Sequence, residues 1–194
     1  GLKTLVDLRS EDERKNSTFT NYPKIVDNIK HLPISPEPGI KLHHSIINGK
    51  ASEQLTKKFM IQSYASYVKD FTNEYSCLIK LISDPKNLPL VFHCSAGKDR
   101  TGFATAVIYL LLDIPIEKIY DDYLLTNSFW KPSIDFSKGL DKGVVNAMLQ
   151  AHRIYLDSSL KKINELYGST KNYLENGLRL DSDTIKMVKN SLLE

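Results

Sequence analysis

The order of apolar and polar positions divides the chain into short strands and longer helices. Continuous β-branched and apolar runs at Thr4–Leu8 and Leu90–Phe92 are typical of buried strands, and the second is compact enough to be central in a sheet. Another strand is expected over Lys24–Ile34, with apolar contacts from Ile25, Ile29 and Leu32. The segment Pro33–Gly39 is expected to be a loop, because it contains three prolines and a glycine.

Helices are predicted for most of the remaining chain. The pattern from Ser52 to Ile82 predicts one or two amphipathic helices, and Ser10 and Glu13 have capping-box spacing for a short helix or turn. Further helices are expected over Thr101–Leu112, Ile116–Thr126, Val144–Gln150, Tyr155–Tyr167 and Ser182–Leu193, the last one behind the cap Asp181. Strands that alternate with helices in one chain predict an α/β layer.

Length and composition narrow the class of protein. A chain of 194 residues with an ordinary globular mixture predicts one domain over residues 1–194 and excludes a disordered or fibrous chain. The net charge of +3 is too small to indicate a nucleic-acid partner. The longest apolar stretch, Phe103–Leu112, is too short to span a membrane. The chain begins with Gly1 and leads at once into a strand, so we expect the natural protein to begin further upstream.

A thiol and an arginine stand at the junction of a predicted strand and a predicted helix. Five residues separate Cys94 from Arg100, and the small residues among them, Ser95, Ala96 and Gly97, allow the backbone to curl with its N–H groups inward. The following helix adds N-terminal donors and the positive end of its dipole. Such a loop is suited to hold a tetrahedral oxyanion.

Each residue of this loop has an expected role in phosphoryl transfer. Cys94 is expected to attack phosphorus as a thiolate, because inward N–H groups and a helix N-terminus favour ionised sulfur. Arg100 is expected to bind two phosphate oxygens, and Thr101 to hydrogen-bond Cys94 and ease its departure. His93 is expected to shape the loop, and no metal or other cofactor is needed. The expected phosphate-binding residues are Ser95, Ala96, Gly97, Lys98, Asp99 and Arg100.

Plainer interpretations compete with these assignments. A cysteine after an apolar strand is most often a small core residue, and a metal site is disfavoured because His93 and Cys94 are adjacent without a C-x2-C partner. The pair His43-His44 is expected in a solvated loop or at a strand end. Cys77 is expected to be a buried helix residue, or alternatively a redox partner of Cys94. Solvated helix faces are expected to carry the lysine pairs Lys57-Lys58 and Lys161-Lys162.

The segment His93–Gly102 resembles the active-site loop of cysteine-dependent protein phosphatases in the form H-C-x-A-G-K-D-R-T-G. This form is similar to that of the atypical bacterial tyrosine/serine phosphatases of dual or triple specificity, typified by the secreted mycobacterial tyrosine phosphatase B. The resemblance continues at Val6–Ser10 with Glu13, similar to D-L-R-S-x-x-E, and at Asp122–Asn127, similar to D-Y-L-x-S/T-N. A closing pattern Y-L…Y-G-S…Y-L runs from Tyr155 to Leu174.

This resemblance implies a phosphatase-like α/β fold. A small, mostly parallel central sheet flanked by helices is expected, with the active site at the carboxyl end of Leu90–Phe92. Phe129, Trp130 and Phe136 lie where relatives carry a helical lid, so residues 127–154 are a candidate lid, and packing in the core is the alternative.

The identity of the leaving-group acid is open. The family's proposed acid is an aspartate in a proline-containing loop, and the corresponding place in this chain is Pro36. Glu37 is the nearest carboxylate and is our candidate, with Asp99 as a competitor because it lies inside the active-site loop. A solvated loop carboxylate is the alternative for Glu37. Family members also carry a segment ahead of D-L-R-S that this chain lacks.

The resemblance implies hydrolysis of phosphotyrosine, with phosphoserine, phosphothreonine or phosphoinositides as further substrates, through a cysteinyl-phosphate. Lys98 is a clue to phosphoinositides, because an additional cation suits a multiply charged headgroup, although it could equally face solvent. Phosphorylated proteins or phosphoinositides are the expected partners, without nucleic acid or an integral membrane segment. A pseudophosphatase that only binds phosphorylated partners is the main rival, followed by an arsenate reductase or sulfurtransferase. The cytoplasm and secretion as a bacterial effector both stay open, as does the oligomeric state.

Overall fold

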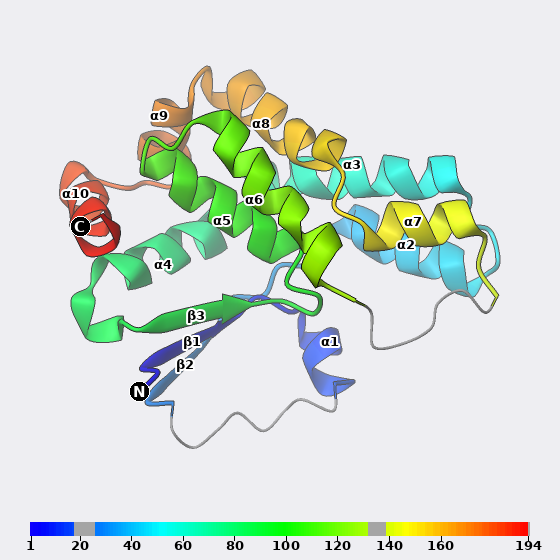
Figure 1. Cartoon of the computed structure of the whole chain (residues 1–194), viewed down its shortest axis with the longest axis horizontal. Helices are drawn as coiled ribbons and strands as arrows, with labels where there is room; N and C mark the ends of the chain where they lie inside the picture. Colours follow the sequence, from blue (N-terminus) through cyan, green and yellow to red (C-terminus); the bar gives the residue numbers. More distant parts are fainter. Residues whose placement is uncertain (18–25, 132–138, 194) are drawn as a thin grey trace.

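Three short parallel strands form one sheet (Figure 1). The computed structural model describes residues 1–17, 26–131 and 139–193. In the described residues β1 (Thr4–Asp7), β2 (Asn28–His31) and β3 (Leu90–His93) pair in the order β2-β1-β3. The parallel registers align Asp7 with His31 and with His93. The carboxyl ends of all three strands therefore meet at one edge of the sheet.

The rest of the described chain is mostly helical. Figure 1 shows α4, α5 and α6 over one side of the sheet, while α1 lies beside the carboxyl ends of the strands. This arrangement agrees with the predicted α/β fold and its small parallel sheet. The helices are α1 (Glu11–Lys15), α2 (Glu37–Ile47), α3 (Glu53–Asp70), α4 (Thr72–Ser83), η1 (Pro85–Asn87), α5 (Asp99–Leu111), α6 (Ile116–Phe129), α7 (Lys142–Leu149), α8 (Arg153–Tyr167), α9 (Thr170–Asn172), η2 (Tyr173–Gly177) and α10 (Ser182–Leu192).

The central strand of the described sheet is β1, so the prediction of a central β3 is wrong. All four residues of β1 are buried, whereas Val91 in β3 is 47% exposed. An apolar run shows how much surface a strand can bury but does not show which neighbours it has. The predicted contact of Ile29 is also wrong, because its side chain in β2 is 45% exposed. Leu32 packs against the core as expected, and Ile25 lies outside the described residues.

The predicted loop Pro33–Gly39 ends early, because α2 begins at Glu37. Pro38 occupies the first turn of this helix, where the missing N–H would have no partner in any case and the fixed φ suits the helix. His43 and His44 are exposed as expected, but they lie in the helix and not in a loop or at a strand end. The first part of the prediction is confirmed, because residues 33–36 are outside any helix or strand, and only its last three residues belong to the start of α2.

The core lies where the helices meet the sheet. Helix α5 contributes buried residues between Phe103 and Leu111, and its Phe103 packs against Tyr67 and Tyr75 from α3 and α4. The prediction of a buried Cys77 is wrong, since this residue of α4 is exposed, and Cys77 and Cys94 are both free thiols. The buried stripe of α4 is formed by its neighbours Tyr75, Ser76, Leu78, Ile79, Ile82 and Ser83.

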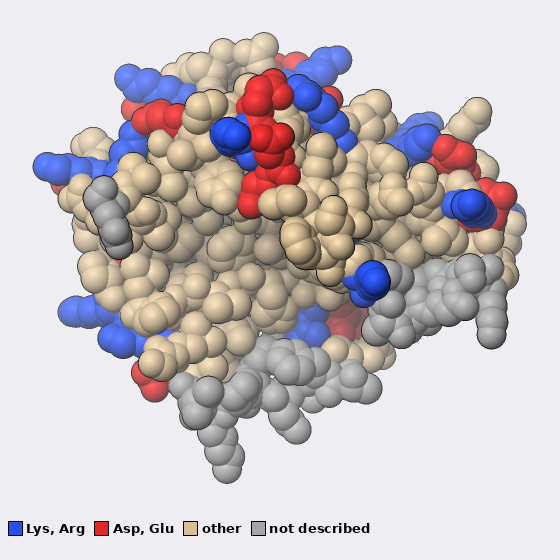
Figure 2. All heavy atoms as spheres, in the orientation of Figure 1, with Lys and Arg blue, Asp and Glu red and all other residues tan. Residues whose placement is uncertain are grey.

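The remaining helix predictions hold to within three residues. Helix α6 continues to Phe129, and α10 begins behind Asp181, whose carboxylate accepts the Thr184 N–H at 2.7 Å. Part of the candidate lid, residues 132–138, lies outside the described residues. None of the described helices has the length and apolar character needed to cross a membrane. Figure 2 shows acidic side chains gathered over α6 and basic ones mainly around the rim of this face.

Candidate active site

Cys94 lies at the edge of the sheet where the strands end. It directly follows β3, and the Leu8 N–H donates to the carbonyl of His93 at 2.8 Å, which ties β3 to the residues that follow β1. Cys94 is only 6% exposed, yet it lines a cavity of about 350 Å³. The other residues that line this cavity are Arg9, Glu13, Ser17, His93 and Ser95. The thiol therefore faces a cavity formed jointly by β3 and the segment around α1.

The loop from Cys94 to Lys98 turns sharply into α5. Gly97 has a φ of +66°, a left-handed conformation that favours glycine, whereas a Cβ at this position would contact nothing within 4 Å. The requirement for glycine is therefore one of backbone conformation and not of space. A His93 ring nitrogen lies 3.0 Å from the Cys94 carbonyl, which agrees with its expected part in shaping the loop.

Arg100 is held by a carboxylate that lies 87 residues away in the chain. Its Nη1 and Nη2 donate to the two oxygens of Glu13 at 2.5 and 2.7 Å, and Nη1 also donates to the Ile34 carbonyl at 3.2 Å. The Arg100 side chain is only 13% exposed. A bidentate contact of this kind fixes both the position and the plane of the guanidinium.

Glu13 is the centre of this arrangement. Ser10 and Glu13 form the predicted capping box of α1, in which the Ser10 N–H donates to Oε2 at 2.8 Å. Oε1 accepts the Ser95 hydroxyl at 2.6 Å, so the same carboxylate binds the active-site loop twice. The sequence identified Glu13 as a helix cap and as the last residue of D-L-R-S-x-x-E. Its distant partner Arg100 was not visible in the sequence.

These contacts shift the ionisation of both partners. Burial raises the pKa of Glu13, but the hydrogen bond and charge of Arg100, with the bonds from Ser95 and Ser10, outweigh it and lower this pKa from 4.5 to about 2. Burial likewise opposes the charged form of Arg100. Its hydrogen bond to Glu13 and the charges of Cys94 and Glu13 nevertheless hold the pKa of Arg100 above its usual value. The guanidinium therefore stays charged beside the thiol.

Lys98 and Asp99 bind each other and residues of other elements, whereas Arg100 binds Glu13. Lys98 is only 2% exposed, so the alternative in which it faces solvent is wrong. Its Nζ donates to Asp99 Oδ1 at 2.7 Å and to the Gln150 carbonyl at 3.4 Å. Asp99, the first residue of α5, is 23% exposed and also accepts the Tyr64 hydroxyl at 2.9 Å. In this structure the ammonium of Lys98 is bound to Asp99 rather than presented to a ligand.

Thr101 and Glu37, two other candidate residues, do not contact Cys94 through a hydrogen bond in the described residues. The Thr101 hydroxyl is buried and has no hydrogen-bond partner among the described residues, so the expected bond to Cys94 is not formed here. Glu37 begins α2, is 76% exposed and forms an ion pair with Lys41 at 2.9 Å. Neither Glu37 nor Asp99 lines the cavity at Cys94. Asp99 nevertheless contacts Lys98 of the loop and Tyr64 of α3, whereas Glu37 is paired only with Lys41 in the described residues.

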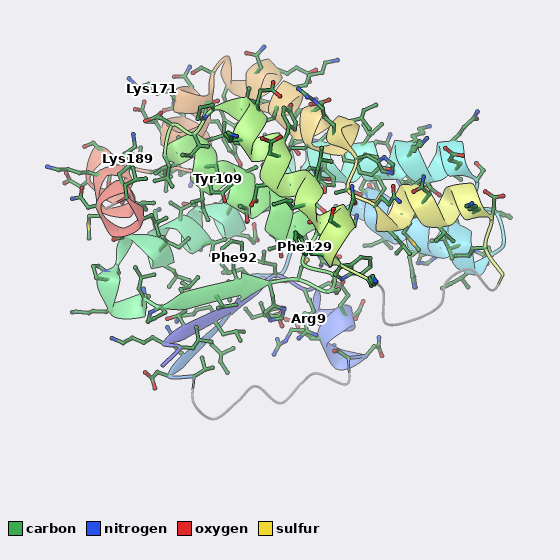
Figure 3. All side chains as sticks on the ribbon, in the orientation of Figure 1. Arg9, Phe92, Tyr109, Phe129, Lys171 and Lys189 are labelled. Atoms are coloured by element: carbon green, nitrogen blue, oxygen red, sulfur yellow. The ribbon has the colours of Figure 1, made fainter. Side chains whose placement is uncertain are left out.

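Arg9 is part of the D-L-R-S pattern, but no role could be assigned to it from the sequence, and in the structure it lines the cavity. Figure 3 shows Arg9 at the carboxyl end of the sheet, beside α1. Its guanidinium binds the buried carboxylate of Asp7, with Nη2 at 2.8 Å from Oδ2, and its Nη1 donates to Ser17 at 2.9 Å. Arg9 and Asp7 are 5% and 1% exposed. This buried pair therefore fixes the segment between β1 and α1, and α1 in turn carries Glu13.

The aromatic residues of the candidate lid separate in the structure. Phe129, at the end of α6, is 80% exposed, so packing in the core is excluded for this residue (Figure 3). Trp130 lines a second cavity of about 640 Å³. Gln150 lines the same cavity, and its carbonyl accepts a hydrogen bond from Lys98. Phe136 lies outside the described residues. In the described part of the chain, no group of three or more His, Cys, Asp or Glu side chains could hold a metal ion.

Comparison with known proteins identifies the family. The tyrosine phosphatase family matches residues 1–194, the whole chain. A Cupriavidus necator protein named as a "putative tyrosine-protein phosphatase" is 30% identical over 129 residues. This segment covers 63% of the chain and 46% of the relative, so the chain spans about half of that protein's length. The loop at Cys94 with its bound arginine agrees with this match, and the chain belongs to the tyrosine phosphatase family.

Proposed function

We propose that the chain hydrolyses phosphomonoesters, with phosphotyrosine as its main substrate, through a cysteinyl-phosphate on Cys94. The observation that supports this most is the position of the thiol in the cavity wall, next to a guanidinium that Glu13 holds fixed. A fixed cation beside a nucleophile stabilises the charge that develops on the phosphoryl oxygens without reorganisation during the reaction.

Two displacements at phosphorus complete the reaction. In the first, the Cys94 thiolate forms a sulfur–phosphorus bond while the bond from phosphorus to the leaving oxygen breaks, and that oxygen takes a proton from a carboxylic acid. In the second, water forms a bond to phosphorus, the carboxylate takes a proton from this water, and the sulfur leaves as the thiolate. One carboxyl group thus serves as acid and then as base.

Arg100 retains donors for the phosphoryl group. The bonds from Arg100 to Glu13, Ile34 and Leu8 use both hydrogens of Nη1 and one of Nη2. Within the described part of the chain, Nε–H and the second Nη2 hydrogen have no protein partner. These two donors form one edge of the guanidinium plane and match two oxygens of a phosphate.

Asp99 is the better candidate for the carboxyl group that exchanges the proton. It lies inside the loop, immediately before Arg100, and its side chain is held by Lys98 and Tyr64. Glu37 is 76% exposed and paired with Lys41, so nothing fixes it near the cavity. Replacement of Asp99 by Asn should lower kcat about 100-fold, within the range of general acid–base catalysis, whereas Glu37→Gln should leave it unchanged.

The breadth of substrates is a separate question. Turnover of phosphoserine, phosphothreonine and phosphoinositides, and a lid over residues 127–154, stay predictions from the family resemblance. Lys98 does not add support for a headgroup site, because its ammonium is engaged by Asp99. Steady-state kinetics on a phosphotyrosine peptide, a phosphoserine peptide and phosphoinositide vesicles would rank these substrates, and we expect the phosphotyrosine peptide to have the highest kcat/KM.

Hydrolysis of p-nitrophenyl phosphate in EDTA tests the proposal. We expect turnover by the unaltered protein and its loss in Cys94→Ser. Cys77→Ser is the matched control, because it removes the other free thiol, which is exposed on α4. Equal turnover in Cys94→Ser and the unaltered protein would exclude Cys94 as the nucleophile. Tight binding of phosphate esters without any turnover would instead indicate a binding protein.

A further inference from the structure

A buried polar network reaches the active-site loop from α3 and α6. Tyr64 on α3 is fully buried, and its hydroxyl lies 2.9 Å from Asp99 Oδ1 and 2.7 Å from the hydroxyl of Tyr123 on α6. Tyr123 is 4% exposed. The loop is therefore attached at Arg100 to Glu13 and at Asp99 to two tyrosines from other helices.

The direction of each hydrogen bond follows from the number of protons. The single hydroxyl proton of Tyr64 is donated to Asp99, so in the contact between the two phenols Tyr123 must be the donor. The result is an ordered chain from Tyr123 through Tyr64 to Asp99 Oδ1. Lys98 donates to this same oxygen at 2.7 Å. Successive bonds of this kind polarise one another and fix the geometry of the acceptor.

Most of the ionisable groups around Asp99 in the described residues are phenols. Lys98 donates to Asp99, and the charge of Asp99 acts on Tyr64, Tyr67, Tyr123 and Tyr155. Two further charges reach the cluster, from Arg100 at Tyr67 and from Glu53 at Tyr155. Burial is the largest cause that raises the pKa of each of these phenols, so they stay neutral in the working range of a phosphatase. The tyrosines therefore act on Asp99 as oriented hydroxyl dipoles or as neutral neighbours.

We propose that Tyr64, supported by Tyr123, is a positioning residue that selects which oxygen of Asp99 exchanges the proton with the substrate. Two donors fill Oδ1, and in the described part of the chain no hydrogen bond reaches Oδ2. The proton that Asp99 gives to the leaving oxygen, and later takes from water, is therefore carried on Oδ2. This inference rests on the proposed function, because it needs Asp99 to be the acid.

The packing of the tyrosines makes the geometry rigid. The ring of Tyr64 packs against Tyr67, Tyr123 and Tyr155, with centroids 5.1, 6.2 and 5.8 Å away. Gly102 of α5 is close to the Tyr123 ring, since a Cβ there would approach a ring carbon to 3.0 Å. The Tyr64 hydroxyl thus cannot follow Asp99 if the carboxylate turns, and it holds Asp99 in one orientation.

The experiment removes single hydroxyl groups and compares leaving groups. We expect Tyr64→Phe to lower kcat for phenyl phosphate about tenfold, with KM within about twofold, because a misaligned acid loses part of its contribution. The loss should be smaller for p-nitrophenyl phosphate, whose leaving group needs less protonation. Tyr123→Phe should cause a smaller loss in the same direction. The matched control is Tyr155→Phe, which removes a buried hydroxyl bonded to the Ala147 carbonyl at 2.7 Å in the same aromatic cluster.

A double-variant cycle decides whether Tyr64 acts through Asp99. In the Asp99→Asn background we expect Tyr64→Phe to have no further effect on kcat, because the group that it positions is gone. Equal losses from Tyr64→Phe in both backgrounds, or an equal loss from Tyr155→Phe, would overturn the positioning role while leaving the enzyme established. An inactive unaltered protein would overturn the proposed function and this inference together. Thermal unfolding of each variant shows whether it is folded.

Discussion

Glu13 joins a helix cap to Arg100 of the candidate active site. We predict that Glu13→Gln lowers kcat/KM for p-nitrophenyl phosphate about 10- to 100-fold, the equivalent of one charge-assisted hydrogen bond. The amide keeps the shape of the side chain but loses the charge that holds Arg100 at 2.5 and 2.7 Å. Steady-state kinetics at neutral pH measure this loss.

Glu11→Gln is the matched control on the same short helix. Glu11 is 60% exposed, and its ion pairs with Arg14 and His31 lie outside the cavity. We expect its kcat/KM to stay within about twofold of the unaltered protein, as for most surface substitutions. Equal losses in the two variants would show that the bond to Arg100 has no special part in turnover.

At the scale of residues, the sequence predicted neighbours in the chain but not distant partners. The strand, the curled loop and the arginine at Cys94 could be inferred because one continuous segment, Leu90–Arg100, carries them. The bonds from Arg100 to Glu13 and from Tyr64 to Asp99 join residues 87 and 35 positions apart. Such pairs depend on how the elements pack, which the local pattern does not contain.

The N-cap of the short helix α1 holds the turn that carries Glu13, which binds Arg100 of the candidate active site. We predict that Ser10→Ala lowers stability by ~1 kcal/mol, as for other N-cap losses, and also lowers kcat/KM about fivefold, because the first turn that carries Glu13 frays. Ser52→Ala is the matched control, since Ser52 caps α3 through the Leu55 N–H at 3.2 Å, away from the cavity. Urea unfolding measures the stability of both variants, and steady-state kinetics measure their kcat/KM. An equal loss of kcat/KM in Ser52→Ala and Ser10→Ala would contradict a specific effect of the α1 cap on Glu13.

At the scale of elements, helix periodicity was the reliable signal. Three-to-four spacing of apolar residues identified α3 and α4. Helices were also predicted at α5, α6, α8 and α10, and Asp181 is the cap of α10 as predicted. Prolines near Glu37 suggested a loop because the rule against proline applies to the helix interior and not to its first turn. The place of β3 at the edge of the described sheet depends on its pairing with β1, which four residues cannot specify.

For the whole molecule, the Glu13 contact predicts acid sensitivity. The folded chain lowers the pKa of Glu13 from 4.5 to about 2, so the ionised carboxylate stabilises the fold above about pH 5 and this contribution is lost as the pH falls toward 2. The side chain is 35% exposed, and after allowance for solvent screening we expect the loss to be on the order of 2 kcal/mol.

Urea unfolding at a series of pH values measures this contribution. Other carboxylates titrate in the same range, so the informative quantity is the difference between the unaltered protein and Glu13→Gln. We expect the free energy of unfolding of the variant to fall less steeply between about pH 5 and pH 2. Parallel curves for the two proteins would show that Glu13 has the same pKa in the folded and the unfolded chain.

The central claim is a covalent bond between phosphorus and the sulfur of Cys94. Rapid acid quench during turnover of p-nitrophenyl phosphate, followed by peptide mass spectrometry, tests this bond most directly. We predict that the peptide containing Cys94 gains the mass of one phosphoryl group in the unaltered protein and in Cys77→Ser, but not in Cys94→Ala. Steady turnover with no phosphoryl mass on that peptide, or with the mass on a different residue, would contradict the claim.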